Sequence, residues 1–212
     1  MKTSEFIAAL AADPVPEPVR LGRRVAAAIA LGLVVSLTIF ALLTEPRPDI
    51  AEAARTPRFL LKFVDAFAFA LPSLLLTLRL ARPDASPDAI ALWLIAPFVL
   101  LGAGVIVELT VVPQDEWLTR LIGDNSMHCM GMIPTLAAPI LAGLIIALRP
   151  GAPLHPALTG AMAGAASAGI AALIYAPSCA DDSPLFVATW YPLATLICIG
   201  VGALAGRRFL SW

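Results

Sequence analysis

The stretch MGMIPTLAAPILAGLIIAL, residues 130–148, decides the fold, because none of its side chains is charged. A helix rises about 1.5 Å per residue, so about 20 apolar residues are needed to cross a hydrocarbon core of roughly 30 Å. Five further stretches of similar length and composition lie before and after it along the chain. The six predicted membrane helices are residues 25–43, 59–78, 90–109, 130–148, 157–175 and 185–205.

The composition excludes a water-soluble domain. Of the 212 residues, 59% are hydrophobic and only 14% are charged, whereas a soluble protein of this length needs far more charge on its surface. Strand-like alternation of apolar and polar residues is absent, and a helix satisfies its own backbone hydrogen bonds within lipid. The sequence therefore predicts an all-α polytopic membrane protein, with a six-helix transmembrane domain at 21–212 that follows a cytoplasmic segment at 1–20.

The distribution of basic residues predicts which side of the membrane each loop faces. With the N-terminus inside, nine Lys and Arg residues fall on the cytoplasmic side and five on the other side. Because loops rich in Lys and Arg stay in the cytoplasm, both termini are predicted to be cytoplasmic, an N-in/C-in topology. The nine inner residues are Lys2, Arg20, Arg23, Arg24, Arg79, Arg82, Arg149, Arg207 and Arg208.

The N-terminal residues 1–13 form a small amphipathic unit in which Phe6, Ile7 and Leu10 share one helical face. Such a helix could lie on the inner leaflet, or it could dock into the groove of a cytoplasmic partner with these three residues as anchors. Lys2 is the only basic residue before Arg20, so attraction to anionic lipid is weak and the charge favours a protein partner.

Two of the three cysteines are predicted to emerge on the same side of the membrane. Cys129 lies at the outer start of the fourth stretch, and Cys179 lies in the outer loop after the fifth. The sixth stretch carries Cys198 about 20 Å below the outer rim, which indicates a small apolar core residue. For the outer pair three interpretations remain open: a structural disulfide, a reversible thiol pair that senses oxidant or thiophilic metal, and a standing metal site.

The residues around the first outer cysteine give the metal interpretation some support. The segment 127–132 holds a thiol, an imidazole and three thioethers, so that His128 is a candidate ligand beside Cys129 and Cys179. Soft ligands of this kind suit copper(I), cadmium or zinc. The spacing matches no established metal-binding motif, so we expect no resident cofactor and at most a transient thiophilic metal ion.

Other patterns predict helix packing rather than chemistry. The motifs Gly160-x-x-x-Gly164 and Gly202-x-x-x-Gly206 allow close contact between two membrane helices. Lys62 and Asp65 are three residues apart on the second stretch and could pair near its outer end.

No phosphate loop and no nucleophile–base arrangement can be picked out, so the sequence predicts a non-enzyme. A small membrane transporter or a thiol oxidoreductase that uses the outer cysteines is the alternative. A transporter would need polar groups near the midplane, and an oxidoreductase a closely spaced reactive pair; neither feature is visible in the sequence.

The chain resembles the NrsF-type membrane anti-sigma factors, and the two outer cysteines with their flanking residues are the most specific part of the resemblance. The N-terminal residues from Met1 to Ala11 also fit. The matching residues of the second half are Cys129, Ile133, Pro134, Leu148, Arg149, Pro150, Gly151, Ala152, Pro153, Gly160, Ala161, Ala163, Gly164, Tyr175, Ala176, Cys179, Asp181, Asp182, Ser183, Pro184, Phe186, Trp190 and Tyr191.

The resemblance implies a six-helix bacterial inner-membrane protein that restrains an extracytoplasmic-function sigma factor and does not itself bind nucleic acid. The N-terminal segment would hold the sigma factor at the membrane, away from core RNA polymerase. A heavy-metal or oxidative signal at Cys129 and Cys179, on the periplasmic side, would then release it. The residues 176–178 before the second cysteine read Ala-Pro-Ser where the family pattern has a Leu-His pair, so direct coordination by a histidine at that point is not expected.

Overall fold

The computed structural model describes Thr3, residues 21–83 and residues 88–211, and within these parts the chain is helical with no strand. The all-α prediction is therefore confirmed. Six helical segments are long and apolar enough to cross a membrane, and each contains one of the predicted stretches. The helices are α2 (Leu21–Leu43), α3 (Ile50–Ala53), α4 (Pro57–Leu80), α5 (Asp88–Trp93), α6 (Ile95–Val111), the 3₁₀ turn η1 (Gln114–Glu116), α7 (Trp117–Ile122), α8 (Ser126–Leu148), α9 (Pro156–Tyr175) and α10 (Pro184–Phe209).

The third predicted helix is interrupted once. The helices α5 and α6 meet at Leu94, where the backbone makes a turn. Pro97 explains the break, because it has no N–H to donate to the Trp93 carbonyl and its ring collides with that carbonyl. The two helices together still form a single span from Ile90 to Val111.

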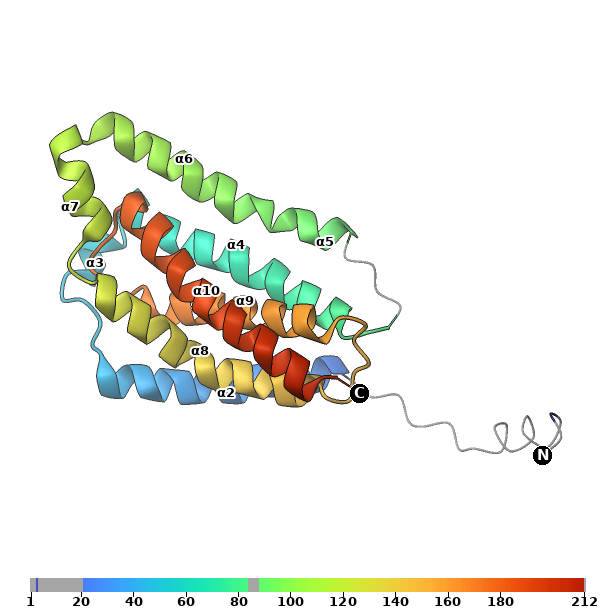
Figure 1. Cartoon of the computed structure of the whole chain (residues 1–212). Coiled ribbons are helices and arrows are strands. Elements are labelled where there is room, and N and C mark those ends of the chain that lie inside the picture. The colour runs from blue at the N-terminus through green and yellow to red at the C-terminus, as the bar shows by residue number, and fades with distance from the viewer. Residues whose placement is uncertain (1–2, 4–20, 84–87, 212) are drawn as a thin grey trace.

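The helix α9 lies at the centre of the bundle, against α10, α4 and α8 (Figure 1). Its contact with α10 is made by backbone, because a Cβ atom on Gly160 or Gly164 would overlap the backbone of α10 at Gly202 or Cys198. A Cβ atom on Gly202 or Gly206 would likewise overlap the backbone of α9. The predicted role of the paired glycine motifs is therefore confirmed.

The helix α2 packs along α8, which gives a second close helix pair. The Ser36 hydroxyl donates a hydrogen bond of 2.7 Å to the Leu136 carbonyl. A Cβ on Gly32 would come within 2.8 Å of the Ile140 Cα atom, so only glycine allows this approach. Much of the remaining surface of α2 is apolar and exposed, as expected for a helix that faces lipid.

The bundle has two ends of different composition. The first end carries α3, α7 and the loop 176–183 between α9 and α10, and we call it the cysteine end (Figure 1). The other end carries the start of α2 and the end of α10, and we call it the terminal end. Seven arginines of the described residues gather at the terminal end: Arg23, Arg24, Arg79, Arg82, Arg149, Arg207 and Arg208.

Candidate functional site: the buried cysteine pair

Cys129 and Cys179 belong to one buried cluster at the cysteine end, and neither has any exposed surface. The sequence predicts Cys129 at the outer start of its helix, but α8 begins earlier, at Ser126, so that Cys129 lies within the first turn. Its N–H donates to the Asn125 carbonyl at 2.8 Å, a regular helical hydrogen bond. Cys179 lies in the loop between α9 and α10, as predicted.

All three cysteines are free thiols. Burial raises the pKa of the Cys179 thiol, and the attraction of the Lys62 ammonium group only partly opposes this effect. Its S–H group points to the Asp181 carbonyl, 3.8 Å away. A protonated, enclosed thiol reacts slowly with oxidants and metals, so any chemistry at this residue requires the loop to open. Cys198 is buried in α10, which confirms the prediction of a core residue.

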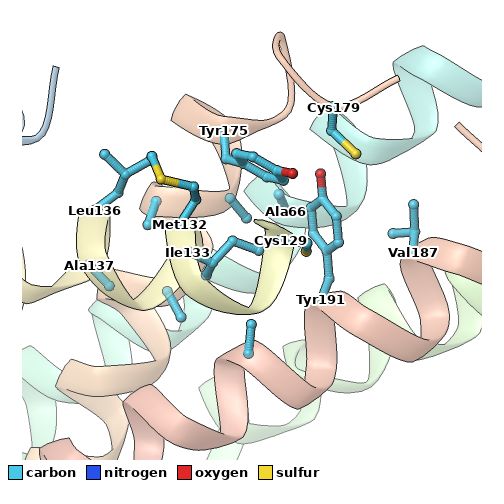
Figure 2. Packing of buried hydrophobic residues seen from close by; sticks show 14 of the residues in the cluster. Ala66, Cys129, Met132, Ile133, Leu136, Ala137, Tyr175, Cys179, Val187 and Tyr191 are labelled. Atoms are coloured by element: carbon cyan, nitrogen blue, oxygen red, sulfur yellow. The ribbon is translucent and has the colours of Figure 1, made fainter. Parts of the chain in front are cut away.

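Two tyrosines enclose the pair of thiols. Tyr175 at the end of α9 has no exposed surface, Tyr191 in α10 is 7% exposed, and their ring centroids are 6.3 Å apart. Figure 2 shows both hydroxyl groups turned into the same region, beneath Cys179 and beside the start of α8 that carries Cys129. The Tyr175 hydroxyl approaches the Cys179 thiol, but neither hydroxyl has the geometry of a formed hydrogen bond.

The loop that carries Cys179 is fixed from one side by a buried lysine. Lys62 of α4 is 1% exposed, and its ammonium group forms an ion pair of 2.6 Å with Asp182. The same group donates to the carbonyls of Cys179 at 2.9 Å and Asp181 at 3.3 Å. The predicted pairing of Lys62 with Asp65 is wrong, because the Lys62 ammonium group contacts the loop instead, and one buried oxygen of Asp65 has no partner.

An arginine from the connection between α2 and α3 holds the same loop. The Arg47 guanidinium group contacts Asp182 at 2.6 Å and Asp49 at 2.7 Å. The backbone N–H of Arg47 donates a hydrogen bond to the Pro177 carbonyl. Arg47 in turn holds the pKa of Asp49 below its usual value. The loop is thereby connected to the residues that directly follow α2.

Asp181 joins the loop to the start of α8. One carboxylate oxygen accepts three hydrogen bonds of 2.9–3.1 Å, from the backbone of Asp124 and from the backbone and side chain of Asn125. Gly123 precedes them with φ 57°, and a Cβ at this position would meet Phe186 and Asp181. Residues 123–125 thus form the connection between α7 and α8, and this connection positions the segment that leads to Cys129.

Glu108, near the end of α6, connects four helices at the cysteine end, although no sequence motif singles it out. The side chain is 3% exposed and forms ion pairs with Arg58 of α4 at 2.8 Å and Arg120 of α7 at 3.4 Å. Ser183, which caps α10, donates to it at 3.1 Å. These contacts could not be predicted from sequence spacing, because the partners of Glu108 lie 12 to 75 residues away from it in the chain.

His128 lies beside the cysteine pair but on its solvent-facing side. The side chain is exposed, and its ring centroid is 5.8 Å from that of Tyr175. Within the described parts of the chain, no three residues among His, Cys, Asp and Glu come together as metal ligands. The metal role of His128 stays a prediction. The predicted docking residues Phe6, Ile7 and Leu10 lie outside the described residues.

Comparison with known proteins adds a second line of evidence. A family model described as "Negative regulator of sigma F", NrsF, matches residues 10–212. The anti-sigma-F factor NrsF of Caulobacter vibrioides (strain NA1000 / CB15N) is 33% identical over 221 residues, and the alignment covers 100% of both chains. No solved structure is significantly similar to the chain.

Proposed function

The chain belongs to the NrsF family, the negative regulators of sigma F, and from this membership we propose that it is a membrane anti-sigma factor. In this proposal the segment 1–20 holds an extracytoplasmic-function sigma factor at the inner membrane, with Phe6, Ile7 and Leu10 as anchors. A heavy metal or an oxidant reacts with Cys129 and Cys179 and causes release. The observation that carries the proposal is the enclosed thiol pair at the opposite end of the bundle from the start of α2.

The charge at the two ends supports the proposed orientation. In the described part of the chain seven arginines lie at the terminal end, and the positive-inside rule places such an end in the cytoplasm. The segment 1–20 precedes α2 directly and would then meet cytoplasmic partners. The cysteine end would face the periplasm, where thiols encounter metals and oxidants before these enter the cell.

A continuous packed route joins the two ends. The helix α8 carries Cys129 in its first turn and lies along α2, which begins at Leu21, the residue after the proposed docking segment. A second connection runs from the Cys179 loop through Arg47 to the residues after α2. Because packed helices shift as units, a displacement at either cysteine would move α2 and alter how the segment 1–20 is presented.

The burial of both thiols explains how a resting protein would keep its partner. Both cysteines are fully enclosed, and burial keeps the Cys179 thiol protonated. A signal that reacts with them must select a state in which the loop 176–183 has separated from Lys62 and Arg47. We propose this opened state as the one that releases the sigma factor, with no catalytic step by the chain itself.

A reconstitution experiment tests the proposal. The full chain is placed in nanodiscs and immobilised, and retention of extracytoplasmic-function sigma factors from the source genome is measured before and after addition of cadmium. We expect one sigma factor to be retained and then released by cadmium. Phe6→Asp and Leu10→Asp should abolish retention, whereas Cys129→Ser with Cys179→Ser should retain the sigma factor and fail to release it. Normal retention by both aspartate variants would overturn the docking assignment.

A further inference from the structure

We propose that Tyr175 and Tyr191 complete the sensor, so that Cys129, Cys179 and the two phenol groups form one enclosed site for a thiophilic divalent metal ion. The two sulfur atoms would ligate the metal, and the two hydroxyl groups would donate hydrogen bonds to the ligating sulfurs. The inference rests on the proposed function and adds two residues to which neither the family description nor the spacing of the sequence assigns a role.

The first supporting observation is that both hydroxyl groups are buried without a hydrogen-bond partner. Tyr175 is fully buried and Tyr191 is 7% exposed, yet neither hydroxyl oxygen has a formed hydrogen bond. A buried polar group without a partner destabilises the fold, and phenylalanine would fill the same space without this cost. Two such groups in one place indicate a state of the protein in which both have partners.

The second observation is where the hydroxyl groups point. They come from different helices, α9 and α10, and both face the region that contains the two thiols (Figure 2). The two thiols and both tyrosine side chains belong to one packed cluster of buried residues. Tyr175 also supports the ring of the exposed His128, so the cluster approaches the surface at this residue.

The donor set suits a soft metal ion. When a divalent metal binds both thiols, two S–H bonds break, two metal–sulfur bonds form and two protons pass to water, which leaves a site without net charge. An uncharged site is compatible with a buried, apolar setting. Thiolate sulfur accepts hydrogen bonds, and among the described buried residues of this cluster the two phenol O–H groups are left without a partner.

The neighbouring carboxylates cannot take the place of the phenols without breaking other contacts. Asp181 is engaged by Asp124 and Asn125, and Asp182 is engaged by Lys62 and Arg47. The remaining groups are soft sulfur ligands, so the site should prefer cadmium or zinc and reject calcium and magnesium, which need oxygen ligands.

The test compares Tyr175→Phe, Tyr191→Phe and the double variant with the unaltered full chain in nanodiscs. Cadmium affinity is measured by titration calorimetry and by the ultraviolet charge-transfer absorption of cadmium–thiolate bonds, and thermal stability is measured without metal. Thr189→Val is the matched control, because it removes a hydroxyl two residues from Tyr191 that already donates to the Leu185 carbonyl at 2.9 Å.

Each tyrosine substitution should leave the metal-free protein as stable as before or more stable, and should weaken cadmium binding about tenfold, the effect of one hydrogen bond to a charged acceptor. The control should bind cadmium normally. Cadmium affinities within twofold of the unaltered chain would overturn the role of the tyrosines and leave the proposed function intact. Loss of metal-free stability in the tyrosine variants would also overturn it, because it would reveal a structural role. If the unaltered chain itself shows no cysteine-dependent cadmium binding, metal sensing fails together with this inference.

Discussion

At the residue scale, the cysteine end depends on a lysine that is almost entirely removed from solvent. Lys62 is 1% exposed, and its ammonium group contacts Asp182 and two loop carbonyls and lies 5.5 Å from the centre of the Phe59 ring. A buried charge is tolerated only when it is paired and hydrogen-bonded. The neutral thiol of Cys179 is thus enclosed under a loop whose position is fixed by a charge on α4.

We predict that Lys62→Met destabilises the protein, because it leaves the Cys179 and Asp181 carbonyls without a donor. Asp182 keeps Arg47 as a partner, so the loss should be about 2–4 kcal/mol rather than the larger cost of an unpaired buried charge. Thermal unfolding in detergent measures the effect, and alkylation of Cys179 should become faster. Arg55→Met, at an exposed position, serves as the control. Equal stability of the two variants would show that the loop does not depend on Lys62.

At the element scale, the contact between α9 and α10 is made by backbone and admits no added side-chain atoms. Gly202 lies against Gly160 and Gly164, whereas Gly200 on the same helix has open space at its Cβ position. Gly202→Ala should destabilise the bundle by about 1–3 kcal/mol through overpacking. Gly200→Ala should be neutral or stabilising by up to about 1 kcal/mol, since alanine favours helix more than glycine. Thermal unfolding of the two variants separates these effects, and equal stability would contradict the close backbone contact.

The contact between α2 and α8 leads to a prediction about signal transmission rather than stability alone. A Cβ on Gly32 would force α2 away from Ile140, whereas a Cβ on Gly22 of the same helix meets nothing. Under the proposed function, Gly32→Ala should bind cadmium normally but release the sigma factor poorly, or fail to hold it at rest. Gly22→Ala should behave as the unaltered chain. Both quantities are read from the nanodisc assay, and a normal response of Gly32→Ala would exclude α2–α8 packing as the route.

At the scale of the whole molecule, the two ends differ in charge, and this difference predicts the orientation. Single cysteines placed at Asp115 and at Ser211, in a chain whose native cysteines are replaced by serine, lie at the cysteine end and the terminal end respectively. We expect a membrane-impermeant maleimide to label Asp115→Cys in intact cells and Ser211→Cys only after the cells are lysed. The reverse pattern would contradict the N-in/C-in topology.

The sequence by itself determined the number and position of the helices that are long and apolar enough to cross a membrane, because the length of an apolar stretch is a local property. It also determined that the glycine motifs lie at a helix contact and that Cys129 and Cys179 share one end of the bundle, since helices of equal length alternate in direction. The break at Leu94 could have been read from Pro97, three residues later.

Only the tertiary structure decided which polar groups meet at the cysteine end. The pairing of Lys62 with Asp182 and the convergence of three residues on Glu108 join positions far apart in the chain. The enclosure of both cysteines by Tyr175 and Tyr191 likewise has no local signal. These contacts depend on how each helix is rotated about its axis and on the path of each connecting loop. Rotation is set by packing against neighbouring helices, which the hydrophobicity of a single stretch does not encode.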